Sequence, residues 1–342
     1  MEHLDTLQKI AHAMVAGGKG ILAIDESHST CMKRFSGVGI DCTEETRRRY
    51  RELLITAPGI ENYISGMILF DETMRQKIGN GKLFPDVLKS KGMIPGIKVD
   101  TGAKDFALHP GEKITEGLDG LRERFAEYKA LGAQFAKWRA VITVGNGIPT
   151  DACIYANAHT LARYAALAQE AGIVPMVEPE VLMDGNHTIE KCYEVTAKTL
   201  KTLFAQLAEQ GVALSGTVLK TSMVLPGKDC SAQASPEIVA EQTVKCLKEN
   251  VPAELAGIVF LSGGQSDENS TIHLDLMNKL PGSKPWPLSF SYGRALQQPA
   301  LKIWSAAKMG DAERAQGALV TRSKLNSFAA QGKYEPSLEV NF

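Results

Sequence analysis

The 342-residue chain has almost no net charge, no long hydrophobic run and no secretory signal pattern. Its 38 basic and 39 acidic residues leave a formal charge of −1, which gives no reason to expect nucleic acid or an anionic membrane as a partner. No stretch approaches the roughly 18 apolar residues that cross a bilayer, and the first residues lack a basic start with an unbroken apolar core. We therefore expect a cytoplasmic protein without a membrane partner.

Closely spaced metal ligands are also missing. The six cysteines are dispersed and form no CxxC pair, which favours free thiols over disulfides or a zinc site in a chain without an export signal. The seven histidines are scattered, no two of them have metal-ligand spacing, and none ends an apolar run. We therefore expect neither a metal ion nor another cofactor.

Eight short apolar runs are present, and each ends in a polar residue that can take part in chemistry. They cover residues 20–25, 64–71, 96–100, 133–139, 173–180, 216–220, 257–264 and 287–294. Each has the length and composition of a strand and is followed by helical periodicity. This alternation predicts an α/β fold, a (β/α)8 TIM barrel that forms one domain over residues 1–342. An N-terminal amphipathic helix precedes it, and a tail over about 331–342 is expected to be mobile or folded over the mouth.

Apolar residues at helical spacing predict where the main helices lie. The expected helices cover residues 43–56, 115–131, 151–171, 187–210, 235–249, 295–309 and 311–329. The first begins at a Thr43 cap followed by acidic residues, and the fifth has Ser235 as its cap with Pro236 at the first helical position. These helices therefore fill the segments between the predicted strands, and no linker or second domain is needed.

In such barrels the chemistry lies at the carboxyl ends of the strands. Lys220 ends a buried run, and partial desolvation favours a neutral, nucleophilic amine. Lys137 ends the strand two before it and is expected at the same mouth. The residues alone leave a second reading open, in which Lys220 only forms an ion pair with Glu178 or Glu180. These two carboxylates, with Asp25, can either divide proton transfer and charge balance or simply neutralise a basic mouth.

Two groups of residues on opposite sides of the mouth are suited to anions. Glycines let backbone N–H groups approach a phosphate in Ser262-Gly263-Gly264 and Gly293-Arg294, at the ends of the last two runs. The opposite group offers cationic side chains, which are Lys98, Lys137, Arg139, Lys33 and Arg34. A nucleophilic amine between two anion sites suits a phosphorylated carbonyl compound. An iminium stabilises an adjacent carbanion as an enamine, so carbon–carbon cleavage needs no metal.

The motifs resemble those of the class I (Schiff-base) fructose-1,6-bisphosphate aldolases over nearly the whole chain and in the same order. They read KGILAIDES, GIKVD, FAKWR, VEPE, VLK, FLSGGQS, SFSYGRALQ and QGKY. The resemblance implies a homotetrameric enzyme of glycolysis and gluconeogenesis, an aldehyde-lyase. It would cleave fructose 1,6-bisphosphate reversibly to dihydroxyacetone phosphate and glyceraldehyde 3-phosphate.

The resemblance also implies a role for each matching residue. Lys220 matches the Schiff-base lysine, Glu178 the general acid/base and Glu180 its supporting neighbour. Asp25 matches the carboxylate of carbinolamine formation and carbon–carbon cleavage, and Lys137 is one of the residues that position substrate and tune charge. The residues matched to substrate and phosphate binding are Arg139, then Ser262, Gly263, Gly293 and Arg294 at the 1-phosphate, and Lys98, Ser27 and Thr30 at the 6-phosphate.

Three positions depart from the family pattern. The run after DES is HSTCMKR where vertebrate members have TGSIAKR, and Thr101 stands where a lysine is usual. The chain ends at Phe342 where familiar members end in a tyrosine that assists proton exchange on the enamine. We therefore expect the tail to contribute less to proton transfer, so that removing the last residues would lower turnover on the bisphosphate less severely than in tyrosine-ended members.

Other functions fit parts of the pattern. A transaldolase or a sugar-monophosphate aldolase is also a Schiff-base barrel, but a transaldolase has its lysine on another strand and needs no second phosphate site. Fructose 1-phosphate remains a possible substrate. A metal-dependent aldolase would require histidines at strand ends, which the sequence lacks. A non-catalytic binding scaffold would be expected to have lost Lys220 or Glu178 first.

Overall fold

The computed structural model describes residues 3–339, and eight parallel strands close into a barrel. The order around the barrel is β1-β10-β9-β8-β7-β6-β3-β2, and each neighbouring pair is parallel. The strands are β1 (Gly20–Ile24), β2 (Ile64–Leu69), β3 (Ile94–Lys98), β6 (Phe135–Ile142), β7 (Val174–Val181), β8 (Val218–Thr221), β9 (Gly257–Phe260) and β10 (Leu288–Tyr292). Each of the eight predicted runs overlaps one of these strands, so the TIM-barrel prediction is confirmed.

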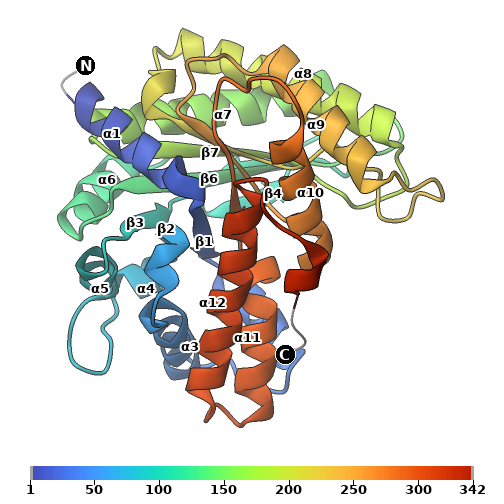
Figure 1. The fold of residues 1–342 in the computed structure, drawn as a ribbon. Coiled ribbons are helices and arrows are strands. Elements are labelled where there is room, and N and C mark those ends of the chain that lie inside the picture. The colour runs from blue at the N-terminus through green and yellow to red at the C-terminus, as the bar shows by residue number, and fades with distance from the viewer. Residues whose placement is uncertain (1–2, 340–342) are drawn as a thin grey trace.

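Helices connect the strands and surround the barrel (Figure 1). They are α1 (Leu4–Val15), α2 (His28–Ser36), α3 (Glu44–Thr56), α4 (Asp71–Arg75), α5 (Phe84–Ser90), α6 (Leu121–Ala130), α7 (Asp151–Glu170), α8 (Ile189–Glu209), α9 (Pro236–Asn250), α10 (Asp267–Lys279), α11 (Arg294–Ala306) and α12 (Ala312–Ala329). Short 3-10 turns cover Ala16–Gly18, Ile60–Asn62, Leu214–Gly216 and Pro336–Leu338. The predicted caps are present, since the Thr43 hydroxyl accepts from Thr46 N and the Ser235 hydroxyl from Ile238 N.

One predicted helix starts later than the sequence pattern indicated. The expected helix 115–131 begins only at Leu121, and residues before it form β5 (Lys113–Glu116), which pairs antiparallel with β4 (Gly102–Asp105). Gly117 (φ +128°) and Gly120 (φ +63°) adopt backbone conformations that a helix interior does not allow. This hairpin after β3 was not predicted, and it contributes to the rim of the barrel mouth.

The amino-terminal end of the barrel is closed by α1. Its buried residues Leu7, Ala11 and Met14 form one apolar cluster with inward-facing strand residues such as Phe135 and Val259. Figure 1 shows α1 lying across this part of the barrel. Because this end is filled with apolar side chains, the opposite end is the one available for chemistry.

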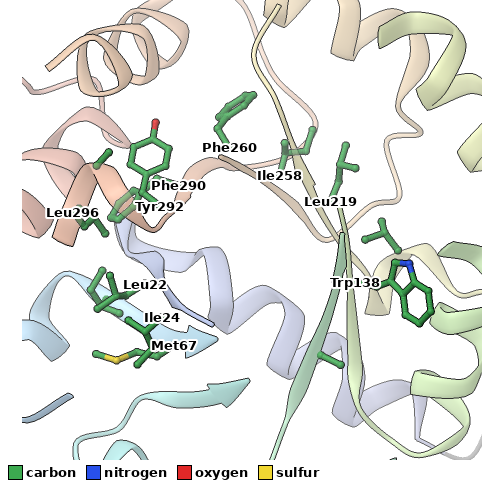
Figure 2. Packing of buried hydrophobic residues seen from close by; sticks show 14 of the residues in the cluster. Leu22, Ile24, Met67, Trp138, Leu219, Ile258, Phe260, Phe290, Tyr292 and Leu296 are labelled. Carbon is green, nitrogen blue, oxygen red and sulfur yellow. The ribbon is translucent and has the colours of Figure 1, made fainter. Parts of the chain in front are cut away.

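A second, larger cluster fills the space between the strands and the surrounding helices. Figure 2 shows part of it, where Leu22, Ile24 and Met67 lie near Leu296 and where Trp138 lies apart, toward the side of Leu219. These strand residues alternate with the inward-facing ones, as the pleat of a strand requires. Since both faces of every strand are buried, the register of the barrel is strongly fixed.

The described part of the C-terminal tail packs on α10 and α12. Tyr334 is 2% exposed, its N–H donates to Asp275 Oδ1 (2.9 Å) and its hydroxyl to Glu339 Oε1 (2.9 Å). Glu339 also pairs with the buried Arg322 at 2.6 Å. Residues up to Glu339 are thus anchored beside the barrel. The prediction about the last residues of the chain concerns 340–342, which lie outside the described residues, and tail mobility stays a prediction.

Candidate active site

The inward positions of the strands change from apolar to charged toward the carboxyl end of the barrel. On β7, Val174 and Met176 belong to the cluster that α1 closes, and Glu178 and Glu180 follow at the same period of two. Proline has no backbone N–H to donate to a neighbouring strand. The pairing of β7 with β8 covers only Met176 and Val177 and ends before Pro179, so Pro179 does not disturb the alternation. The two glutamates therefore share one face of the strand.

Four charged groups meet at the centre of the mouth. Lys137 Nζ lies 2.7 Å from Asp25 Oδ2 and 3.3 Å from Glu178 Oε2. Lys220 Nζ lies 3.2 Å from the other oxygen of Glu178. Glu178 thus bridges the two lysines, and all four side chains are at most 12% exposed. The sequence predicted that these residues share one mouth, and the structure brings them within ion-pair distance.

The lysines keep the two carboxylates ionised. Burial alone would raise the pKa of Asp25, but the charges of Lys137 and Lys220 outweigh it and lower the pKa to about 2. Burial would likewise raise the pKa of Glu178, and the same two lysines together with Arg139 lower it. Burial would lower the pKa of Lys137, but Asp25 and Glu178 raise it well above its ordinary value. Lys137 is therefore held as an ammonium ion.

A second group of charges lies beside this centre. Lys98 Nζ contacts Asp100 Oδ1 (2.7 Å) and the Asp100 carbonyl oxygen (2.8 Å), while Asp100 Oδ2 accepts from the backbone N–H of Arg139 (3.2 Å). The Arg139 guanidinium pairs with Glu180. Burial would lower the pKa of Arg139, but Glu180 and Glu178 raise it further. Asp100 was not predicted, although it lies two residues after Lys98, on the same side of the chain.

The glycine-rich loop after β9 lies on one side of the mouth. Gly263 (φ +49°) and Gly264 (φ +100°) both have positive φ, which turns the chain and leaves its backbone open to a close approach. Gly293 is the N-cap of α11, and Arg294 Nη2 donates to the Gln265 carbonyl oxygen at 2.5 Å. Backbone N–H groups at a helix start and one arginine are thus available to an anion here.

The start of α2 builds another part of the mouth, next to β10, since α2 follows β1 and β1 is the neighbour of β10. Ser27 is its N-cap and accepts from Thr30 N at 3.4 Å. Arg34 pairs with Glu26, which also contacts Arg51 at 2.8 Å, and this fixes the guanidinium beside the mouth. Arg34 Nε and Nη2 are buried and have no hydrogen-bond partner among residues 3–339. They are suited to an anion, whereas Lys33 is exposed and does not line the cavity.

One cavity of about 1250 Å³ joins all these groups. It is lined by every residue that the family resemblance matched to the site, which are Asp25, Ser27, Thr30, Lys98, Lys137, Arg139, Glu178, Glu180, Lys220, Ser262, Gly263, Gly293 and Arg294. No cluster of three His, Cys, Asp or Glu side chains within residues 3–339 could hold a metal ion. Two groups of residues that are suited to an anion therefore share one cavity with a buried lysine–carboxylate centre.

A family model described as "Fructose-bisphosphate aldolase class-I" matches residues 6–341. The chain belongs to the class-I fructose-bisphosphate aldolase family. It is 62% identical over 332 residues to a probable fructose-bisphosphate aldolase class 1 from Xanthomonas campestris, covering 97% of this chain and 99% of that one. It is 50% identical to the cytosolic fructose-bisphosphate aldolase 4 of Arabidopsis thaliana, over 96% of this chain and 84% of that protein.

A solved aldolase has the same fold. The fructose-bisphosphate aldolase of Plasmodium falciparum, solved in complex with TRAP and a small molecule inhibitor, matches with a TM-score of 0.96 and 45% identity. The match covers 98% of this chain and 96% of that one. Family membership makes the chain a carbon–carbon lyase by class. No helix in the described part of this aldolase is long and apolar enough to cross a membrane.

The aldolase cavity also contains residues that the motifs did not bring forward. Ser291 of β10 lines it, is 1% exposed, and its hydroxyl has no hydrogen-bond partner within the described chain. Lys104, on the unpredicted hairpin, and Lys228 line it as well. Ser291 could have been found from the alternation of residues in SFSYGR, because it shares its face with Ser289. The two lysines carried no such signal, because neither Lys104 in the short strand β4 nor Lys228 in its loop follows an apolar run.

Proposed function

We propose that this class-I aldolase cleaves fructose 1,6-bisphosphate reversibly to dihydroxyacetone phosphate and glyceraldehyde 3-phosphate through a Schiff base on Lys220. The observation that supports this is the unequal charge balance of the two central lysines. Lys137 has two carboxylate partners, Asp25 and Glu178, whereas Lys220 has only Glu178 among the residues that the structure describes. Because Lys137 is held as an ammonium ion by its two partners, Lys220 is the candidate nucleophile.

The first half of the reaction forms the iminium. Lys220 Nζ gives its extra proton to a carboxylate and attacks the C2 carbonyl carbon, whose oxygen becomes the hydroxyl of a carbinolamine. Glu178 lies 3.2 Å from Lys220 Nζ and is the nearest group to accept the first proton and to return one to the departing hydroxyl. Water leaves and a C2=N bond forms. The ammonium ion of Lys137 holds Glu178 in place.

The second half breaks the C3–C4 bond. A carboxylate takes the proton of the C4 hydroxyl, the C4 oxygen forms the aldehyde, and the electron pair of the C3–C4 bond moves into the iminium to give an enamine. Asp25, kept ionised by Lys137, is suited to take this proton. Protonation of the enamine at C3 and hydrolysis of the imine then release dihydroxyacetone phosphate and restore Lys220.

Two phosphates would hold the substrate across the mouth. The 1-phosphate is assigned to Ser262, Gly263, Gly293 and Arg294, and the 6-phosphate to Lys98, Ser27, Thr30 and Arg34, with Arg139 between them. Phosphate groups bound to backbone N–H groups and arginine supply binding energy that orients the reacting carbons over Lys220. Two such sites favour the bisphosphate over fructose 1-phosphate, which a comparison of kcat/KM for the two sugars would test.

The decisive experiment is borohydride reduction in the presence of dihydroxyacetone phosphate, followed by intact mass measurement and peptide mapping. A single adduct on Lys220 is the expected result. No adduct, or an adduct on Lys137, would overturn the assignment. A control without the ketone phosphate reports any adduct that does not come from the imine.

Assembly and cellular location are further parts of the proposal. We expect a homotetramer in the cytoplasm that serves glycolysis and gluconeogenesis, as the family resemblance implies. A relative from Arabidopsis thaliana is named as cytosolic. Light scattering coupled to size-exclusion chromatography would measure the mass of the assembly, and a monomer at micromolar concentration would contradict the tetramer.

A further inference from the structure

Gln265 connects the two halves of the glycine-loop side of the mouth. Its backbone N–H donates to the Ser262 carbonyl oxygen (3.0 Å), which closes the turn over Gly263 and Gly264. Its own carbonyl oxygen accepts from Arg294 Nη2 (2.5 Å). One residue therefore joins the loop after β9 to the arginine that begins α11.

The side chain of Gln265 is itself fixed from behind the loop. Its Oε1 lies 2.6 Å from Nδ1 of His273 on α10, and its Nε2 lies 3.5 Å from Met223 Sδ. Gln265 and His273 are each 5% exposed. Because an amide oxygen only accepts, the contact places the ring proton on Nδ1. Burial lowers the pKa of His273 to about 4, outweighing a weak opposing effect of Glu237, so the ring stays neutral.

The loop needs such an anchor because its glycines allow many backbone conformations. Two successive glycines have the largest conformational freedom of any dipeptide, and freezing them when a phosphate binds would cost affinity. Outside the site itself, the closing residue Gln265 is held by His273 and Met223, both buried. An ordered loop before binding lowers this cost, which acts on binding more than on the chemical step.

We propose that His273 is a positioning residue which, through Gln265, holds the glycine loop and Arg294 ready for the 1-phosphate end of the substrate. The inference rests on the proposed function, since it takes the loop as the 1-phosphate site. His273 does not line the cavity and so acts only through Gln265. His273 lies outside the family motifs. Its sequence position, in the middle of a helix, would by itself indicate only a core residue.

The test compares His273→Leu, which removes the donor, with His273→Asn, which keeps one. We expect His273→Leu to raise KM for fructose 1,6-bisphosphate about 5- to 10-fold, the effect of about one hydrogen bond, with kcat changed less than about 2-fold. His273→Asn should restore KM to within about 2-fold of the unsubstituted enzyme. Gln265→Met keeps the side-chain volume and should behave like His273→Leu, which covers the case where His273→Leu does not fold.

Gln169→Leu is the matched control, because Gln169 is also a buried hydrogen-bonded glutamine (1% exposed) but lies at the C-terminal end of α7, donates to the Ala213 carbonyl oxygen and does not line the cavity. It should lower the melting temperature without raising KM. The proposal is overturned if His273→Leu and Gln265→Met fold with unchanged KM, or if His273→Asn gives no rescue. Failure of the proposed function is distinct, because it would show as no Lys220 adduct in the unsubstituted enzyme. In that case the positioning role can still be tested by measuring the binding of inorganic phosphate, which should be weaker in His273→Leu than in the unsubstituted enzyme.

Discussion

The ammonium group of Lys137 lies 2.7 Å from the carboxylate of Asp25, across the mouth from β6 to the residue that follows β1. This ion pair distinguishes the two central lysines, because Lys137 shares a second carboxylate, Glu178, with Lys220. Lys137 is thus held charged, and under the proposed function Lys220 is the lysine that reacts. The difference between the two lysines comes from their carboxylate partners and not from the lysine side chains themselves.

The first prediction separates these roles by conservative substitution. Lys220→Arg should abolish the borohydride adduct and lower kcat by at least about 1000-fold, because guanidinium does not form the imine. Lys137→Arg keeps a cation near Asp25 and Glu178, so the adduct on Lys220 should persist while kcat falls less. Peptide mapping after reduction measures both. Loss of the adduct in Lys137→Arg with retained fold would contradict the division of roles.

The second prediction concerns the two glutamates of β7. Glu178→Gln should lower kcat about 100- to 10,000-fold, the usual size of a lost acid/base group. Glu180→Gln releases Arg139 from its ion pair and should mainly raise KM. Steady-state kinetics on fructose 1,6-bisphosphate compare them. A larger loss of kcat in Glu180→Gln than in Glu178→Gln would reverse the assignment.

The third prediction follows from the lowered pKa of Asp25. Its value of about 2 in the folded chain is below the ordinary value near 4, so Asp25 contributes stability above pH 4 and loses it as pH falls toward 2. The contribution is about 2 kcal/mol at neutral pH. Urea unfolding of the unsubstituted protein and of Asp25→Asn should therefore differ most at pH 6–7 and converge toward pH 2. A difference that is constant with pH would contradict the ion pair.

Much of this site follows from the sequence because charged residues sit at the ends of apolar runs. The shared location of four residues could be predicted from the rule that the carboxyl ends of parallel strands meet at one edge of the barrel. These residues are Asp25, Lys137, Glu178 and Lys220. What the sequence could not supply is which charges pair across the mouth, since Lys137 and Glu178 come from neighbouring strands but Asp25 comes from the far side. Pairing depends on barrel closure, which no local pattern contains.

The errors in the fold prediction have a local cause. The predicted helix 115–131 includes the last two residues of β5, because Leu118, Leu121 and Phe125 have helical spacing. Two glycines with positive φ, Gly117 and Gly120, delay the helix start to Leu121. The contact of Glu339 with Arg322 of α12 could not be predicted, because it depends on how the tail packs on that helix.

A fourth prediction tests the interior packing of the barrel. A Cβ atom added to Gly96 would lie 2.1 Å from the ring of Phe135, which fills the barrel beside it. Gly96→Ala should therefore destabilise the fold by about 1–3 kcal/mol, as overpacking does. Adding Phe135→Leu should recover part of the loss by making room. The control Gly39→Ala has positive φ but open space, so only its backbone strain should appear.

The fifth prediction concerns the anchored tail. Arg322 is 2% exposed and pairs with Glu339 at 2.6 and 2.7 Å, so removing the carboxylate leaves a buried guanidinium without its charge partner. Glu339→Gln should lower the free energy of unfolding by about 3 kcal/mol. The matched control Glu335→Gln removes an exposed carboxylate from the same segment and should change it by less than about 0.5 kcal/mol. The double substitution Arg322→Met with Glu339→Met removes both charges and should be less destabilised than Glu339→Gln. Denaturant unfolding measures all three, and equal effects of Glu339→Gln and Glu335→Gln would show that the pair does not anchor the tail.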